Sequence, residues 1–326
     1  MQLVTHKKLY LVSGRISRPL SEAIADEMGE TLGDPNIDEF ANGEIHCRFS
    51  ESIRGSDVFI IQTHAHQNGS SINDALMEQL IMIDAARRAS AKRITVVCPH
   101  YGYARQDRKV SGREPITASL VANLFKVAGA SRLVAIDLHS GQIQGFFDGP
   151  VDHLTAMPVL VERLRSLKGD LSIVSPDAGR VKVAERYAMQ LHADLAIVHK
   201  RRSHTGFKTV EAKEVVGDVA GRVCVIVDDM IDTAGTVCAA AEQLVDRGAE
   251  RVIAATTHGL FSGPALERLT ASPIEKVIVT DTLPLPDGID PDFIEVLSVA
   301  PLIARAIGAV FADTSVSEIF GGENLS

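Results

Sequence analysis

Three carboxylates and a run of small residues follow an apolar segment in the stretch CVIVDDMIDTAGTV, residues 224–237. Asp228 and Asp229 come directly after the apolar run, and Asp232 opens the sequence Thr-Ala-Gly-Thr. In open α/β sheets, ligands bind beyond the carboxyl ends of the strands. We therefore expect the apolar run to be a strand whose end carries a ligand site.

The residues after the acidic pair suit a phosphate group. Small residues let backbone N–H groups approach an anion, hydroxyls add donors, and a helix N-terminus adds partial positive charge. Carboxylates suit sugar hydroxyls instead, either directly or through a divalent metal. A phosphate and a vicinal diol together describe a pentose phosphate, although Asp232 is also expected to cap the helix that follows. The phosphate segment consists of Asp232, Thr233, Ala234, Gly235 and Thr236.

Two further polar residues stand just past apolar runs and could ligate a metal. His139 follows RLVAID, and Asp177 follows LSIV. A single histidine or aspartate in such a place is more often a hydrogen-bonded structural residue, so each is a weak signal alone.

The N-terminal half carries residues that suit a nucleotide. In FANGEIHCRF, residues 40–49, an aromatic ring stands beside Asn42-Gly43-Glu44 and could stack on a purine. In PHYGYARQDRK, residues 99–109, Arg105 and Arg108 could grip phosphates. The run Lys200-Arg201-Arg202 is a second basic cluster, which taken alone is typical of a solvated loop.

Strands and helices alternate along the chain. Helical periodicity covers residues 71–91, with Leu76, Leu80, Ile83 and Ala86 on one face, and residues 236–249, with Gly248 as the stop. Strand alternating with helix predicts an α/β fold with parallel sheets. The runs expected as buried strands are residues 58–62, 93–99, 132–138, 171–176, 195–200, 223–229 and 251–258.

An internal repeat relates two parts of the chain. Residues 57–102 and 222–261 share the order strand, loop, helix with a central Glu-Gln-Leu, turn and strand. Two similar α/β halves are the simplest explanation. The first copy has Gln62 and Thr63 where the second has the acidic pair, so the acidic chemistry belongs to the second half.

Composition excludes several classes of protein. The 326 residues carry a net charge of −9, which argues against general binding of nucleic acid or of a membrane surface. No apolar run approaches the ~20 residues of a membrane span, and the N-terminus lacks a signal-peptide pattern. The four cysteines show no CxxC pairing, which predicts buried thiols in a reducing cytoplasm.

The run VIVDDMIDTAGT resembles the phosphoribosyl-pyrophosphate-binding signature of the phosphoribosyltransferase fold. Alone, it allows a transferase that consumes phosphoribosyl pyrophosphate or a synthetase that makes it. The joint order of FANGEI, YARQDRK, DLHSGQIQGFFDGPVDH, SPDAGR and VIVDDMIDTAGT is similar to the ribose-phosphate pyrophosphokinase family over nearly the whole chain.

That resemblance implies two similar phosphoribosyltransferase-type domains, each with a mainly parallel sheet flanked by helices. Residues 1–151 would form the ATP side and residues 152–299 the ribose 5-phosphate side, with a helix at about 300–318 packing back on the first. By the same resemblance, residues divide by role as follows: Phe40, Asn42, Gly43, Glu44, Arg105 and Gln106 bind ATP; His139 and Asp177 bind Mg²⁺; Lys200 and Arg202 are catalytic, on a mobile loop; and Arg202, Asp228, Asp229 and Asp232–Thr236 bind ribose 5-phosphate.

The implied reaction transfers pyrophosphate from ATP to the 1-hydroxyl of ribose 5-phosphate and releases AMP. The resemblance also implies a hexamer, activated by inorganic phosphate and inhibited by ADP, with Arg48, Ser50 and Arg54 as contributors to the effector site. A phosphoribosyltransferase and a non-catalytic regulatory subunit of the synthetase remain as alternatives.

Two positions depart from many members of this family. Ser203 stands where many relatives have a proline, so we expect a loop that is more flexible or closes differently. Arg180 stands where many carry a second glycine. It could add a phosphate contact or pair with Glu185, and we expect the pairing.

Overall fold

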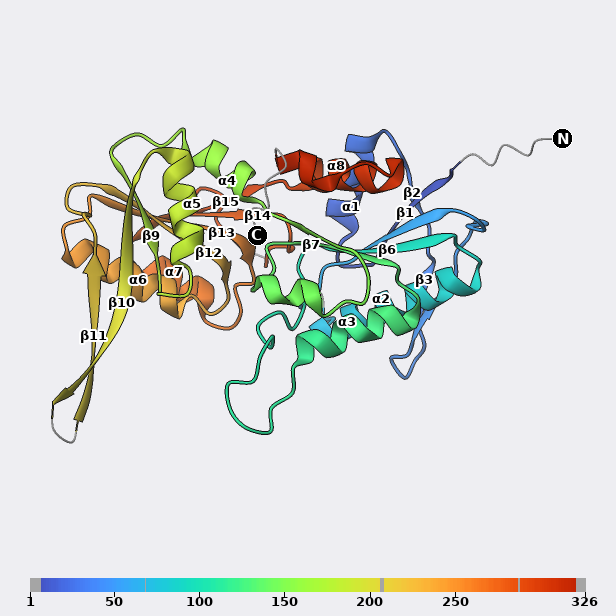
Figure 1. Ribbon diagram of the computed structural model, residues 1–326, viewed down its shortest axis with the longest axis horizontal. Coiled ribbons are helices and arrows are strands. Elements are labelled where there is room, and N and C mark those ends of the chain that lie inside the picture. The colour runs from blue at the N-terminus through green and yellow to red at the C-terminus, as the bar shows by residue number, and fades with distance from the viewer. Residues whose placement is uncertain (1–6, 68, 206–207, 287, 321–326) are drawn as a thin grey trace. The chain divides into compact units, whose positions relative to one another are not determined.

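The chain divides into two compact units, which the computed structural model describes over residues 7–67, 69–205, 208–286 and 288–320 (Figure 1). For residues 200–213 it describes the course of the backbone but no side chains. Unit 1 comprises residues up to Thr155, Thr282–Pro284 and the segment from Val299 onward. Unit 2 comprises Ala156–Asp281 and Leu285–Ser298.

Unit 1 is built on a six-stranded sheet in which all neighbouring strands are parallel, in the order β2-β1-β5-β6-β7-β8. A separate antiparallel pair, β3 (Ile37–Glu39) and β4 (Ile45–Cys47), lies between β2 and β5 in the chain. The remaining elements are β1 (Leu9–Ser13), β2 (Leu32–Gly33), β5 (Asp57–Ile61), β6 (Arg93–Cys98), β7 (Arg132–Ile136), β8 (Val151–Leu154), α1 (Arg18–Met28), α2 (Ile72–Arg88), α3 (Thr117–Ala128), α8 (Ala300–Ala312) and the 3-10 helices Gly141–Gly145 and Val316–Phe320.

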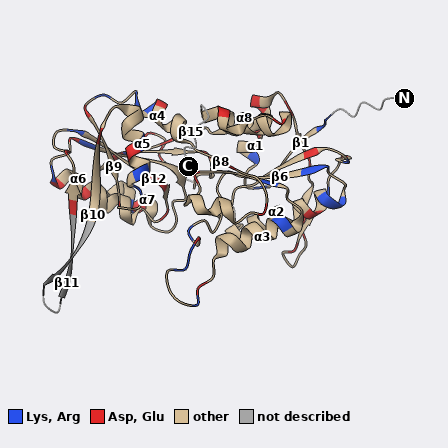
Figure 2. Ribbon diagram, in the orientation of Figure 1, with Lys and Arg blue, Asp and Glu red and all other residues tan. Residues whose placement is uncertain are grey.

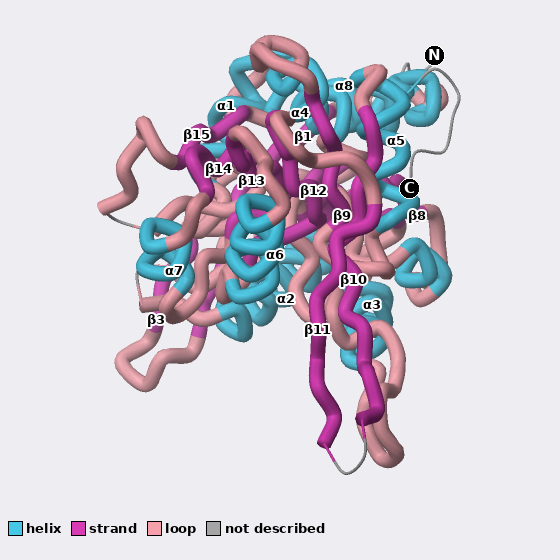
Figure 3. Tube along the Cα trace, turned by 90° about the vertical axis from the view of Figure 1, so that its left-hand side faces the viewer, coloured by secondary structure: helices cyan, strands magenta, loops and turns pink. Residues whose placement is uncertain are grey.

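Unit 2 is built on a seven-stranded sheet in the order β11-β10-β9-β12-β13-β14-β15, parallel except for the pair β10–β11. That pair forms a long hairpin that extends beyond the rest of the sheet (Figures 1 and 3). The elements are α4 (Met157–Leu164), β9 (Leu171–Ser175), α5 (Val181–Leu191), β10 (Asp194–Thr205), β11 (Lys208–Val216), β12 (Val223–Ile231), α6 (Gly235–Asp246), β13 (Arg251–Gly259), α7 (Ala265–Ala271), β14 (Ile274–Thr280) and β15 (Ile294–Leu297).

The two sheets share one topology. The order β2-β1-β5-β6-β7-β8 in unit 1 matches β10-β9-β12-β13-β14-β15 in unit 2, strand for strand. In each sheet, the chain goes from the first strand to the neighbouring strand on one side, and then crosses back to add the remaining strands on the other side of the first. Right-handed crossovers in opposite directions place their helices on opposite faces of the sheet. The repeat seen in the sequence corresponds to β5-α2-β6 and β12-α6-β13.

The predicted α/β class with two similar, mainly parallel sheets is confirmed. All seven expected strands are present, although β10 and β12 run past the expected ends. Helix α2 begins with a capping box between Ser71 and Asp74 and buries Ile83 and Ala86. Helix α6 ends before Gly248, whose positive φ of 87° turns the chain away.

None of the described helices is long and apolar enough to cross a membrane.

Candidate functional site

The acidic pair lies at the point of the unit 2 sheet where the chain order reverses. Strands β9 and β12 are neighbours there, and their pairing ends at Ile226. Asp228 and Asp229 therefore lie beyond the paired part of β9, in the position where open α/β sheets bind ligands. The strand does not end at the pair as expected from the sequence, because β12 continues beside β13 as far as Ile231.

Arg180 contacts both carboxylates. Its Nε lies 3.2 Å from Asp228 Oδ1, and its Nη2 lies 2.6 Å from Asp229 Oδ2. The arginine side chain is only 15 % exposed, and Asp229 is buried. The sequence favoured a pair between Arg180 and Glu185. The structure instead ion-pairs Arg180 with the strand-end aspartates, while Glu185 is exposed on α5.

The electrostatics of the pair follow from this crowding. Burial and the neighbouring charge of Asp229 raise the pKa of Asp228 to about 8, and Arg180 acts in the opposite direction. The backbone N–H of Asp229 also donates to Asp228 Oδ1 at 2.8 Å. Two carboxylates this close compete for one proton unless cationic or hydrogen-bond donors neutralise them.

The loop after β12 turns its backbone amides toward one side. Three consecutive carbonyl oxygens of this loop accept hydrogen bonds. Ile231 O accepts the Leu260 N–H at 2.9 Å, and Asp232 O accepts the Ser262 N–H at 2.9 Å. Thr233 O accepts a hydrogen bond from Arg268 Nη1 at 3.0 Å. In a trans peptide the carbonyl and the following N–H point in opposite directions, and the described chain contains no cis bond. The amides of residues 232–234 therefore point away from the β13–α7 segment, as in an anion-binding nest.

Ala234 completes the turn into α6. It adopts a left-handed conformation with φ 60° and occupies the N-cap position, where no side chain caps the helix. The expectation that Asp232 caps α6 is therefore wrong. No side chain therefore caps the N–H groups in the first turn of α6, and such groups can bind an anion.

Asp177 is held in a tight turn after β9. Its Oδ1 accepts the Gly179 N–H at 2.7 Å, and its carbonyl accepts the Ser175 hydroxyl at 2.6 Å. The side chain is exposed. This turn leads directly into Arg180, the N-cap residue of α5.

His139 belongs to unit 1, on the loop after β7. The preceding residue, Leu138, donates its N–H to His153 Nε2 at 2.8 Å, and burial lowers the pKa of His153, which favours the neutral ring that accepts this bond. Within the described chain, the buried Ser140 hydroxyl next to His139 has no hydrogen-bond partner. Such an orphaned oxygen fits a place that an external oxygen ligand or water completes.

No cluster of three or more His, Cys, Asp or Glu side chains occurs among the described residues. Mg²⁺ is commonly held by one or two protein ligands together with substrate phosphates and waters. Within unit 1, the imidazole of His139 and the orphaned Ser140 oxygen are donor types that fit such a substrate-completed ion. Within unit 2, the exposed carboxylate of Asp177 fits one as well.

The matching point of the unit 1 sheet is filled by the protein itself. A Cβ on Gly14 would lie 2.3 Å from the Gln62 side chain, which is fully buried and donates to Glu78 Oε1 at 2.8 Å. The buried Glu78 carboxylate also accepts the Arg15 N–H at 2.7 Å and pairs with its guanidinium. Gln62, which replaces the first residue of the acidic pair, thus fills the space beside Gly14.

The nucleotide candidates of unit 1 lie on a hairpin tip and on a loop. Phe40, Asn42, Gly43 and Glu44 form the turn between β3 and β4, where Gly43 has a positive φ of 87° and Phe40 is 57 % exposed. The Phe40 ring meets His46 edge-on, with centroids 5.9 Å apart.

Arg105 and Gln106 lie on the loop between β6 and α3, on which Figure 2 shows basic segments. Both side chains are exposed, and the Gln106 carbonyl accepts the Ala118 N–H at the start of α3. The loop is thereby tied to the helix that follows it.

Lys200 and Arg202 lie on β10, paired with Lys213 and Glu211 of β11, and not on a loop as the sequence suggested. Their side chains are outside the described part of the chain.

Two functional candidates were missed or misread in the sequence. Arg268 of α7 bonds to the loop between β12 and α6, and Arg180 at the start of α5 contacts the acidic pair. Both act across distances of more than 30 residues in the chain, so no local spacing could reveal them.

Comparison with known proteins gives consistent results for the whole chain. Residues 9–129 match the N-terminal domain of ribose phosphate pyrophosphokinase, and residues 204–321 match the phosphoribosyl synthetase-associated domain. The chain is 54 % identical over 316 residues to a ribose-phosphate pyrophosphokinase of Streptomyces avermitilis, and the match covers 96 % of both chains. It is 53 % identical over 319 residues to a ribose-phosphate pyrophosphokinase of Bifidobacterium longum, and that match covers 96 % of this chain and 93 % of the relative. The crystal structure of phosphoribosylpyrophosphate synthetase from Mycobacterium smegmatis superposes with a TM-score of 0.88 at 48 % identity, covering 94 % of this chain and 100 % of that one.

Proposed function

Because this chain belongs to the ribose-phosphate pyrophosphokinase family, we propose that its two units divide the substrates, with ribose 5-phosphate on unit 2 and ATP on unit 1. The chain is an enzyme that makes phosphoribosyl pyrophosphate from ATP and ribose 5-phosphate. It transfers the β,γ-pyrophosphoryl group to the 1-hydroxyl of the sugar, and AMP leaves.

The assignment of the sugar phosphate to unit 2 rests on one observation. The acidic pair on β12 is followed, within a few residues, by a loop whose backbone amides form a nest before α6. Asp228 and Asp229 supply acceptors for the ribose hydroxyls. The amides of residues 232–234, the Thr233 and Thr236 hydroxyls and the N-terminus of α6 supply donors for the 5-phosphate.

The assignment of ATP to unit 1 rests on the β3–β4 tip and the Arg105 loop. An exposed aromatic ring offers a stacking face for adenine, and Asn42 and Glu44 beside it offer hydrogen-bonding groups. Arg105 and Gln106 supply donors for the phosphates.

In this reaction the sugar oxygen attacks the β-phosphorus and the bond between the β-phosphorus and the oxygen bridging to the α-phosphate breaks, so charge grows on the phosphoryl oxygens and on AMP. His139 and Asp177 are each proposed to help hold Mg²⁺ on the substrate phosphates, where the ion would neutralise that charge. Lys200 and Arg202 are proposed to supply fixed positive charge to the same oxygens. None of these roles requires a covalent enzyme intermediate.

We also assign the chain to a homo-oligomer, with a hexamer as the expected state and phosphate and ADP as effectors. The support from unit 1 is an apolar stripe on α3, formed by Leu120, Leu124 and Val127 at i, i+4 and i+7, which are 54 %, 39 % and 75 % exposed. Exposed apolar faces of this kind mark contact surfaces. Arg48, Ser50 and Arg54 are exposed and stay candidates for the effector site.

All four cysteines are free, and three are buried. Free thiols fit a reducing compartment, which supports the proposed location in the cytoplasm.

One assay tests the function. The protein is incubated with ATP, Mg²⁺ and ribose 5-phosphate, with and without inorganic phosphate, and AMP is measured. AMP release without any added base is expected. AMP release would be absent in a phosphoribosyltransferase, which needs phosphoribosyl pyrophosphate and a base, and in a non-catalytic regulatory subunit.

A further inference from the structure

A guanidinium occupies the space between the two carboxylates of the acidic pair. Arg180 uses two different nitrogens, Nε toward Asp228 and Nη2 toward Asp229, so a single side chain bridges both groups. Bridging two carboxylates is also what a divalent cation does at an acidic pair. The arginine thus stands where such a cation would bind.

The position of Arg180 is fixed by its own backbone. Its carbonyl accepts the N–H groups of Val183 and Ala184 in the first turn of α5, each at 3.0 Å. Its side chain is 15 % exposed. The guanidinium is therefore held at the pair by the start of a helix and does not reach it from a flexible surface position.

The positive charge of Arg180 decides which groups can bind at the acidic pair. Guanidinium keeps its proton at every physiological pH, so the positive charge is permanent. A divalent cation approaching the same oxygens would meet this charge at close range, whereas a neutral sugar hydroxyl would not.

We propose that Arg180 is a positioning residue that takes the place of a metal ion at Asp228 and Asp229, keeping the pair as a site for sugar hydroxyls and excluding divalent cations from it. The consequence for ribose rests on the function proposed above. The exclusion of cations does not, because it concerns only the chain's own groups.

Metal titration without substrate tests the exclusion. Mn²⁺ binding to the full chain is counted by electron paramagnetic resonance, since Mn²⁺ prefers the same oxygen ligands as Mg²⁺. Arg180→Gly is expected to gain one Mn²⁺ site, with affinity about tenfold or more above any binding of wild type at the pair. Glycine is well tolerated at a helix N-cap, so α5 should still form. Circular dichroism checks this, and Arg180→Gln is a second neutral variant.

Three controls sharpen the result. Arg180→Lys keeps the charge and should gain no site. Lys182→Gln removes a charge from an exposed position on the same helix and should also gain none. Adding Asp229→Asn to Arg180→Gly should abolish the gained site. The proposal is overturned if Arg180→Gly and Arg180→Gln fold but gain no Mn²⁺ site. It is also overturned if the single substitution Asp229→Asn removes a Mn²⁺ site that wild type has.

A kinetic measurement then tests the link to ribose. At saturating Mg·ATP, the KM of Arg180→Gly for ribose 5-phosphate should be about tenfold above wild type at low free Mg²⁺, and should fall as free Mg²⁺ rises, with kcat less affected. If the Mn²⁺ site appears and this KM is unchanged, the cation exclusion stands and the placement of ribose at the pair is wrong.

Discussion

At the scale of single residues, position in the sheet decides what a polar side chain can do. Gln62 and Asp228 occupy matching places in the two repeats: Gln62 directly follows β5, and Asp228 lies on β12 beyond the part that pairs with β9. Gln62 is buried and bonded to Glu78, so its side chain is held inside the protein. Asp228 is half-buried in a crowded acidic pair, so its carboxylate gains from an external hydrogen-bond donor.

Lys200 carries the first prediction. Lys200→Ala should lower kcat by several orders of magnitude, because a fixed positive charge near the transferred phosphoryl group acts mainly in the transition state. The KM for ATP should change only modestly. Lys208→Ala, farther along the same hairpin, is the matched control. An unchanged kcat would remove Lys200 from the catalytic assignment.

Arg268 carries the second prediction, because it holds the loop between β12 and α6, where we propose that the 5-phosphate binds. Its Nη1 donates to Thr233 O, which fixes the direction of the Ala234 amide. Arg268→Ala should raise the KM for ribose 5-phosphate about tenfold, the effect of one charge-assisted hydrogen bond, with a smaller change in kcat. Steady-state kinetics measure this split, with Arg247→Ala at the end of α6 as control. Equal KM values in Arg268→Ala and wild type would contradict the role.

At the scale of elements, regular strands and helices could be predicted from the sequence, but hairpins and short edges could not. Six of the seven Val- and Ile-rich runs are buried strands, whose apolar content is a local signal. The seventh, in β10, buries only Ala196 and Val198 of its described side chains. The strands β2 and β3 have two and three residues, too few for periodicity. The run around Lys200 was expected to leave the sheet, yet β10 continues through it because β11 pairs with it residue by residue.

Parts of the candidate site could also be predicted from the sequence, and other parts could not. The acidic pair on a strand and the loop into the next helix could be predicted because one stretch holds both. Their binding of ribose 5-phosphate stays a prediction. The expected cap at Asp232 failed because the left-handed Ala234 takes the N-cap position. The partner of Arg180 could not be predicted, since the choice between Glu185 and the strand-end aspartates depends on how α5 packs beside β12.

The tip of β3–β4 carries an element-scale prediction. Phe40 is exposed at the turn and offers its ring for stacking, which contributes ~1–3 kcal/mol per base in comparable contacts. Phe40→Ala should raise the KM for ATP about tenfold or more and leave the KM for ribose 5-phosphate little changed. Phe40→Tyr keeps the ring and should retain near wild-type values. If both variants keep wild-type KM, adenine does not stack there.

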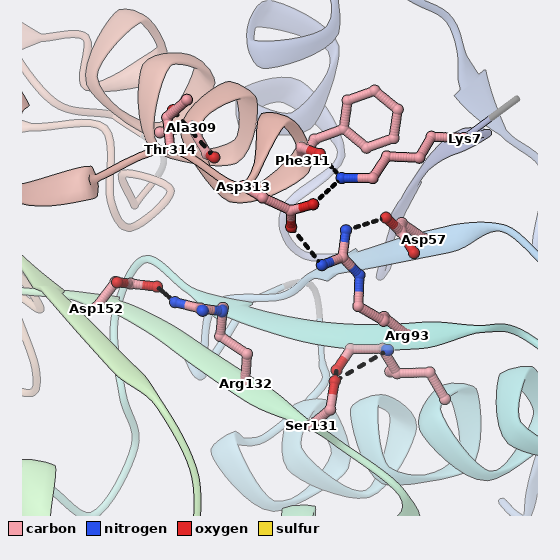
Figure 4. A network of polar contacts seen from close by, with 11 residues as sticks. Lys7, Asp57, Arg93, Ser131, Arg132, Asp152, Ala309, Phe311, Asp313 and Thr314 are labelled. Atoms are coloured by element: carbon pink, nitrogen blue, oxygen red, sulfur yellow. Dashed lines mark hydrogen bonds and ion pairs between the residues drawn. The ribbon is translucent and has the colours of Figure 1, made fainter.

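At the scale of the whole molecule, the C-terminal helix belongs to the N-terminal unit, and an ionic network fastens its end there (Figure 4). Asp313, the left-handed C-cap of α8, pairs with Lys7 and with Arg93, whose Nη1 lies 2.6 Å away. Arg93 also pairs with the buried Asp57, and Lys7 donates to the Phe311 carbonyl. The network joins residues from near both ends of the chain.

Acid should weaken this network in a defined pH range. Hydrogen bonds from Arg93 and Lys7 lower the pKa of Asp313 to about 2. A depressed carboxyl pKa adds stability above the unfolded value near 4, which is lost as pH falls toward 2. Asp313→Asn should therefore lower Tm relative to wild type at pH 6, and the difference should vanish by about pH 2. Asp26→Asn, which removes an exposed carboxylate on α1, should show no such pH-dependent difference in Tm. If the Tm of Asp313→Asn is lower than that of wild type by the same amount at every pH, the ion pairs of Asp313 are not the cause.

The apolar stripe on α3 carries the last prediction, which concerns assembly. Leu120, Leu124 and Val127 lie opposite the buried residues Val121, Ala122 and Phe125, so the helix is apolar on both faces although one is exposed. Covering the stripe with another copy of the chain would remove apolar surface from water. Leu124→Lys should shift the mass measured by light scattering after gel filtration toward smaller species, because a buried lysine would be unpaired. Met189→Lys, at an exposed apolar position on α5, is the control. If Leu124→Lys keeps the wild-type mass, the contact surface lies elsewhere.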